Sequence, residues 1–347
     1  MGEFTWALPA AESCTVIRSS LFCSGLWAAS VASCACHQPE LPNDLQSRSG
    51  DALSASHSRN IPKDALPNAV VRRQNYRIEF GPYAVEVDPF DGGRILEFSL
   101  DGRSVILPFS ESPEASGSSF WPSPQSNWTW PPPVEFDKLP WTVSIDGQAL
   151  TLTSATSRNL GLSARQRIQA LADRLAISIE FQITNRANSP RKVAPWQNTR
   201  VRPKGITFYP SSEPTYSQSS LKLTPSGGVT WYAHDPVQIK ESLKSYADGH
   251  EGWMAQIDGD LLFVKVFPDV PREAQAPEEG EIVIYVHNSG RFVEMEQQGA
   301  YTELAPGQSL SWPVYFILRQ IPKTIEIRPG NPQLVELARQ MAASVRH

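Results

Sequence analysis

The chain has 347 residues and a mass of 38.4 kDa, enough for one large all-β domain or two smaller ones. Its 30 prolines and 10 tryptophans are typical of a β protein rich in loops. A net charge of −5 and a pI near 5.8 leave no basic surface, which argues against nucleic acid as a partner.

The first 34 residues are predicted to form a signal segment. Arg18 precedes an apolar run over residues 21–31 that small residues follow, as in signal peptides. Residues 31–34 read Val-Ala-Ser-Cys and resemble the bacterial lipobox, so we expect Cys34 to carry a lipid that anchors the protein in the membrane. The expected location is the bacterial cell envelope, at the outer membrane facing the periplasm. A plain cleaved signal and a chance apolar stretch are the alternatives.

The residues before Arg18 do not fit a signal, so the start is expected to be over-extended, with Val16 as the initiator. All four cysteines lie in this region, at Cys14, Cys23, Cys34 and Cys36. The folded part therefore has no disulfide. Residues 35–74 are rich in Ser, Pro, Asn and Asp and have few large apolar groups, which predicts a flexible tether.

Residues 75–330 are predicted to fold as strand after strand. Asp-Gly pairs at 101–102, 146–147 and 258–259 separate alternating apolar runs, which is the pattern of β-hairpins. The predicted strands are residues 76–80, 83–88, 93–100, 104–107, 142–145, 149–153, 175–184, 193–201, 254–257, 261–267, 282–287, 291–296 and 309–318.

One helix is predicted, over residues 331–347. Asn331 can cap it, Pro332 suits its first turn, and apolar residues recur behind them at helical spacing. So many strands with one terminal helix predict an all-β fold, a large sandwich of antiparallel sheets.

The stretch 117–133 gathers Phe120, Trp121, Trp128 and Trp130 among five prolines. This composition predicts an ordered loop that is neither a regular helix nor a central strand. Aromatic faces in a proline frame lose little entropy on binding, so we expect a stacking platform for a sugar ring. Alternatively, the tryptophans cap one end of the sandwich core.

Two predicted strands carry polar residues on one face. In residues 195–202 the period of two places Trp196, Asn198, Arg200 and Arg202 together, with the intervening residues on the other side. An aromatic ring, an amide and two guanidinium groups in line are typical of a ligand-facing row. The alternative is a solvated outer face with surface ion pairs.

In residues 291–296 the same period places Phe292, Glu294 and Glu296 on one face. Two carboxylates there can accept sugar hydroxyls or act as a base, and facing arginines would keep both ionised. The alternative is again a solvated face.

Six short motifs follow one another along the chain: residues 91–95 (Asp-Gly-Gly-Arg-Ile), 101–102, 183–185, 190–199, 290–294 (Gly-Arg-Phe-Val-Glu) and 304–309 (Leu-Ala-Pro-Gly-Gln-Ser). In this order they resemble the galactose mutarotase-like (aldose 1-epimerase-like) superfamily, and the resemblance covers residues 75–318. The closest resemblance is to a bacterial branch with a Trp-Pro-rich loop. It implies a β-supersandwich that binds carbohydrate in the concavity of one sheet.

The resemblance also implies residue roles. Glu294 matches the family's general base on the anomeric hydroxyl, whereas Asn198 stands where the histidine acid belongs. An amide has no proton to titrate near neutral pH, which puts mutarotase activity in doubt. His250 or His234 could supply the acid from another direction, although a lone loop histidine is more often structural.

The leading hypothesis is an envelope lipoprotein whose domain binds a carbohydrate, and the two arginines suggest an acidic one. The expected ligand-binding residues are Arg94, Trp121, Trp128, Trp130, Trp196, Asn198, Arg200, Arg202 and Glu296. The alternatives are a sugar epimerase with Glu294 as base and His250 or a water as acid, and a structural envelope protein whose aromatic loop docks a protein partner. Because no phosphate loop, zinc helix or nucleophile elbow occurs, neither a cofactor nor a metal is expected.

Overall fold

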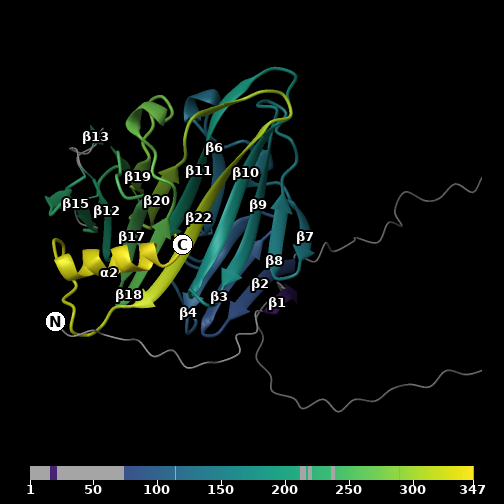
Figure 1. Ribbon diagram of the computed structural model, residues 1–347. Coiled ribbons are helices and arrows are strands. Elements are labelled where there is room, and N and C mark those ends of the chain that lie inside the picture. The colour runs from purple at the N-terminus through teal and green to yellow at the C-terminus, as the bar shows by residue number, and fades with distance from the viewer. Residues whose placement is uncertain are drawn as a thin grey trace, which may run out of the picture. The chain divides into compact units, whose positions relative to one another are not determined.

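The computed structural model of the protein describes residues 16–21, 74–113, 115–211, 216–217, 221–235, 239–288 and 290–346. The expected lipidation site at Cys34 and nearly all of the expected signal segment and tether lie outside these residues. The described residues between 74 and 346 belong to one compact unit that is built almost wholly of antiparallel strands (Figure 1). In the part described, no helix is both long and apolar enough to cross a membrane.

The first sheet has twelve strands, and its main path runs β1-β2-β3-β4-β6-β11-β20-β19-β16-β13. These strands are β1 (Val16–Leu21), β2 (Gln74–Phe80), β3 (Tyr83–Asp88), β4 (Arg94–Leu100), β6 (Ser118–Ser123), β11 (Arg191–Val201), β20 (Val293–Gln298), β19 (Ile282–Val286), β16 (Leu243–Ala247) and β13 (Tyr216–Ser217). Beside the path, β5 (Arg103–Ser104) pairs with β4, and β21 (Thr302–Leu304) pairs with β11.

The second sheet has ten strands in the order β14-β15-β12-β17-β18-β22-β10-β9-β8-β7. These strands are β14 (Thr224–Ser226), β15 (Val229–Ala233), β12 (Ile206–Pro210), β17 (Trp253–Asp258), β18 (Leu261–Val266), β22 (Ser309–Gln320), β10 (Ala176–Asn185), β9 (Leu162–Leu171), β8 (Ala149–Thr153) and β7 (Thr142–Asp146). The three Asp-Gly pairs connect β4 to β5, β7 to β8 and β17 to β18, as predicted, and their glycines have positive φ.

Aromatic side chains hold the two sheets together. Phe120 of β6 stacks on Phe181 of β10 with ring centroids 4.3 Å apart. Phe98 of β4 packs against Phe263 and Phe316 of the second sheet at 6.1 and 6.2 Å. These rings are fully buried, so the main core lies between the sheets.

The predicted C-terminal helix is α2 (Pro332–Ala343), and Gln333 N donates to its capping residue Asn331. The helix packs its apolar stripe on the outer face of the second sheet, next to β18 (Figure 1). The described residues also contain short turns of helix at η1 (Gln125–Asn127), α1 (Val134–Asp137) and η3 (Arg272–Ala274).

The expectation for residues 117–133 was wrong in one respect, because they contain a central strand. The strand β6 lies between β4 and β11 and carries Pro122 in its ladder. The register sets Pro122 opposite Pro195 of β11, so the two missing N–H donors fall at one position. The predicted strand 104–107 also ends early, since Leu107 N turns to donate to Arg200 O.

Lys265 of β18 is a fully buried amine between the sheets. Its Nζ donates to Thr199 Oγ1 of β11 at 2.8 Å and to Met295 O of β20 at 2.9 Å. Burial lowers the pKa of Lys265 well below its usual value. This buried amine thus joins the second sheet to the two strands that carry the polar rows.

We expect Lys265→Met to change how stability depends on pH. The pKa of Lys265 lies well below 10.5 in the folded protein, so between the folded and the unfolded pKa values the unfolded chain binds more protons than the folded protein. The wild-type free energy of unfolding should therefore rise with pH in this window, by up to about 1.4 kcal/mol per pH unit from this group. Urea unfolding at pH 7 and pH 9.5 should show the wild type gaining stability relative to Lys265→Met. The exposed control Lys323→Met should differ from the wild type by the same amount at both pH values. If Lys265→Met also does so, the lowered pKa of Lys265 would be contradicted.

Candidate functional site

The central strand β11 carries the candidate site on the face that points away from the core. Its core-side Thr199 contacts Lys265, so alternation turns Trp196, Asn198 and Arg200 the other way. The register then sets beside them the following residues of β6 and β20: Ser119, Trp121, Glu294, Glu296 and Gln298. We call this the β11 face.

Four tryptophans cluster on the β11 face. Trp196 contacts Trp121 edge to face at 5.2 Å and stacks with Trp128 at 6.0 Å, and Trp130 contacts Trp121 at 6.0 Å. Three of the rings are buried, whereas Trp130 is 65% exposed. Residues 117–133, which were expected to form an aromatic platform, thus bring their three tryptophans into contact with the predicted row of β11 that contains Trp196.

Each buried indole N–H of the cluster has an acceptor. Trp196 Nε1 donates to Glu296 Oε2 at 2.9 Å, Trp121 Nε1 to Asp137 Oδ1 at 2.9 Å, and Trp128 Nε1 to the carbonyl of Pro122 at 2.8 Å. The rings are therefore held at both their apolar and their polar ends, which makes the cluster rigid.

The arginines of the β11 face are paired with carboxylates. Arg200 Nε lies 2.9 Å from Glu294 Oε1, and its Nη1 donates to Ser119 Oγ at 2.7 Å. Arg94 forms ion pairs with Asp91 at 3.1 Å and with Asp137 at 3.3 Å. The positive charges that the sequence suggested for an acidic ligand are thus already balanced.

Glu296 and Lys244 form a second pair. Their charged atoms are 3.8 Å apart, and Lys244 Nζ also lies 5.2 Å from the centroid of the Trp196 ring. Burial raises the pKa of Glu296 to about 8, and the neighbouring Glu294 acts in the same direction while Lys244 opposes both. Two carboxylates of one strand face thus have different surroundings.

Asn198 lies in the middle of these groups with no exposed surface. Neither its Nδ2 nor its Oδ1 has a hydrogen-bond partner among the described residues. Most buried polar groups in folded proteins are hydrogen-bonded, so an amide with two free ends requires an explanation.

Arg202 and His250 are not brought to the β11 face. Arg202 follows the end of β11 and pairs with Glu111 at 2.8 Å and with Asp258 at 3.3 Å. His250 is an exposed residue that lines a separate pocket with Val345 and Arg346, next to α2. In the described part of the chain neither residue forms a hydrogen bond or ion pair with Glu294.

His234 lies at the end of β15 in the other sheet. Its Nδ1 is 3.1 Å from the Tyr232 hydroxyl, and burial lowers its pKa. Neither His234 nor His250 is therefore shown beside Asn198 as a replacement for the family acid in the described part of the chain. The described residues contain no group of three or more His, Cys, Asp or Glu side chains that could hold a metal ion.

Sequence reasoning missed Ser119, Asp137 and Lys244. Lys244 lies on β16, a strand that was not predicted although residues 243–247 alternate between apolar and polar types. That alternation was the available signal. Ser119 and Asp137 carry no comparable pattern, because their partners lie on other strands.

A family model described as "Domain of unknown function (DUF4380)" matches residues 123–318. No curated protein matches the sequence. Solved structures do resemble the chain. One is a TPR-domain containing protein from Parabacteroides distasonis, with 13% identity and a TM-score of 0.53, where the match covers 74% of this chain and 48% of that one. The chain thus spans about half the length of that protein.

Two further similar structures are galactose mutarotase-like proteins. The one from Clostridium acetobutylicum has 12% identity and a TM-score of 0.50, with 72% of this chain and 96% of that chain covered. The one from Lactobacillus casei has 9% identity and a TM-score of 0.51, and the match covers 71% of this chain and 100% of that chain. At such low identity the likeness concerns the fold, which is galactose mutarotase-like as the motifs predicted.

We expect Arg200→Met to destabilise the protein by about 3 kcal/mol, because it leaves the Glu294 carboxylate buried without its partner. Arg200→Met combined with Glu294→Gln should recover much of that loss. Urea unfolding of both variants measures it. Equal stabilities of the single and double variants would contradict the pairing, and Arg202→Met, which removes a more exposed pair, should cost under about 1 kcal/mol.

Proposed function

Because the chain belongs to the family described as Domain of unknown function (DUF4380) and has a galactose mutarotase-like fold, we propose that its β11 face binds a carbohydrate. Sugar rings offer apolar faces to aromatic side chains and a rim of hydroxyls to amides and carboxylates. The β11 face combines these partners: tryptophan rings, the amides of Asn198 and Gln298, and two glutamates.

The observation that carries the proposal is the unpartnered Asn198. Its amide can donate from Nδ2 and accept at Oδ1, and both atoms lack partners in the described part of the chain. Leaving a buried amide unbonded costs about 1–3 kcal/mol, a cost that a bound hydroxyl would remove. A pair of sugar hydroxyls matches this donor and acceptor.

Access to Asn198 requires a side chain to move, because the amide is fully buried. Lys244 is the candidate gate, since its side chain is 23% exposed and its Nζ lies over the Trp196 ring. Trp130, at 65% exposure, offers a ring face at the rim. A ligand that displaces Lys244 from Trp196 would gain that ring as a stacking partner.

The charges of the β11 face favour a neutral ring there. Arg200 and Arg94 are each bound to carboxylates, so an anionic sugar would have to compete with Glu294 or Asp137 for them. That the ligand carries an acidic group stays a prediction. Such a group would have to bind a cation other than Arg200 or Arg94.

We expect Asn198→Leu to stabilise the protein and abolish sugar binding. Leucine has the same branching as asparagine but no polar atom to leave unbonded, so the free energy of unfolding should rise by about 1–2 kcal/mol. Tryptophan fluorescence titration against a broad panel of neutral and acidic glycans measures binding, and urea unfolding measures stability.

The exposed control Asn188→Leu should change neither quantity. Sugar binding retained by Asn198→Leu, or a wild type that binds nothing in the panel, would overturn the proposal.

A second candidate function is a sugar epimerase, favoured by the two carboxylates in different surroundings. Glu294 would take the proton from the anomeric hydroxyl, while Glu296 would give its proton to the ring oxygen as the ring C–O bond breaks. The open aldehyde then closes on its other face with both proton transfers reversed. Glu296 would in this way replace the missing histidine, because burial raises its pKa to about 8 against the opposing charge of Lys244.

For such an epimerase, activity should fall as pH rises through about 8, where Glu296 loses its proton. Polarimetry on several aldoses measures the rate. Glu294→Gln and Glu296→Gln should each remove it, whereas His250→Gln should not. No rate above background, or an unaltered rate in Glu294→Gln, would exclude the epimerase and leave the binding function standing.

Anchoring in the envelope through Cys34 belongs to the same proposal and rests on the sequence alone. Mass spectrometry of the membrane fraction tests it, and an unmodified Cys34 in a soluble protein would refute it. A structural role in which Trp130 docks a protein partner stays the third hypothesis.

A further inference from the structure

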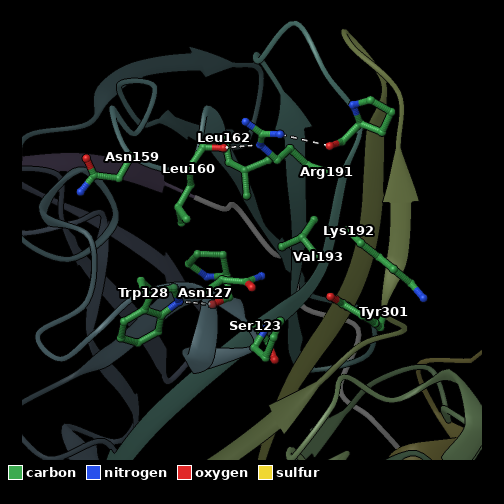
Figure 2. A pocket seen from close by; sticks show the side chains of 13 residues that line it. Ser123, Asn127, Trp128, Asn159, Leu160, Leu162, Arg191, Lys192, Val193 and Tyr301 are labelled. Carbon is green, nitrogen blue, oxygen red and sulfur yellow. Dashed lines mark hydrogen bonds between the residues drawn. The ribbon is translucent and has the colours of Figure 1, made fainter.

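A second cavity of about 340 Å³ lies where β6 ends and β11 begins. Figure 2 shows Trp128 and Asn127 on one side of it, Arg191 above, and Lys192 and Tyr301 on the other side. This volume falls in the range of small-molecule sites. Trp128 belongs to both this cavity and the tryptophan cluster of the β11 face.

The lining of the cavity carries two cations and no carboxylate. None of the described residues that line it is acidic, and neither Arg191 nor Lys192 forms an ion pair within the described ranges. Glu303 of β21 lies opposite Lys192 in the strand register, so the two side chains leave the same face of the sheet, but Glu303 is not part of the lining. The lining itself is therefore positively charged, in contrast to the paired charges of the β11 face.

Both cations are held in place. Lys192 Nζ lies 4.6 Å from the centroid of the Tyr301 ring. Arg191 is fixed by its Nε, which donates to Leu160 O at 3.1 Å, and by its Nη1, which donates to Ser189 Oγ at 2.6 Å. Its Nη2 forms no hydrogen bond with the described residues, so the guanidinium keeps donors for a ligand.

The remaining lining suits a sugar. Trp128 supplies an indole, Tyr301 a phenol, and the exposed Asn127 and Asn159 supply amides (Figure 2). A cavity for a bare inorganic anion needs no aromatic walls. Cations, aromatic rings and amides together fit a sugar unit that carries an acidic group.

We propose that this cavity is a second subsite, which takes an anionic unit of the same glycan whose neutral ring binds the β11 face. The inference rests on the proposed carbohydrate binding and adds its ligand class, an oligosaccharide with at least one carboxylate or sulfate. Lys192 and Trp196 are four residues apart on β11, roughly 13 Å along a strand. That separation calls for a chain of sugars rather than one.

The test is a glycan array that carries neutral, carboxylated and sulfated oligosaccharides, probed with the full folded domain. The wild type should retain acidic oligosaccharides. Lys192→Gln should weaken them about tenfold, which corresponds to the loss of one charge-assisted hydrogen bond, and Lys192→Arg should preserve them. Lys192 is exposed, so its substitution leaves the fold intact, and Lys323→Gln is the matched exposed control.

The outcomes separate the two proposals. If the wild type binds neutral glycans only, or if Lys192→Gln binds acidic ones as tightly as wild type, the second subsite is refuted while the β11 face stands. If no glycan binds, both are refuted. Preference between the carboxylated and the sulfated members identifies which acid the subsite takes.

Discussion

The alternation of side chains along β11 is the constraint on which the site depends. One strand, hydrogen-bonded on both edges, turns Thr199 toward the buried amine of Lys265 and turns Asn198 and Arg200 to the opposite side. A shift of register by one residue would exchange the two faces and place the Arg200 guanidinium in the core. Burial of the aromatic core on one side of β11 therefore determines which residues lie on its polar side.

The pairs across β11 extend this constraint to its neighbours. Glu294 and Glu296 stand opposite Arg200 and Asn198 because β20 is antiparallel and in register. The hydrogen bond from Trp196 Nε1 then reaches Glu296 without any loop being involved. A site on three adjacent strands is more rigid than one on loops, which suits recognition of a ring with fixed hydroxyl directions.

The sequence predicted the fold class and the two polar rows because both follow from local period-two alternation and Asp-Gly turns. It did not predict which charges pair, since Arg202 meets Glu111, a residue far away in the sequence, only after β11 has ended. The composition of residues 117–133 suggested a loop, but β6 is a strand because it pairs with β11, which comes much later in the chain. The pairing of strands that are distant in the sequence decides which side chains meet, and the spacing of residues along the chain does not reveal that pairing.

Trp128 has a consequence that follows from its position rather than from its chemistry. Its ring stacks on Trp196 of the β11 face and also lines the cavity beside Arg191 and Lys192. If ligands occupy both places as proposed, each would touch the same indole, and any coupling between them through this ring would act equally in both directions.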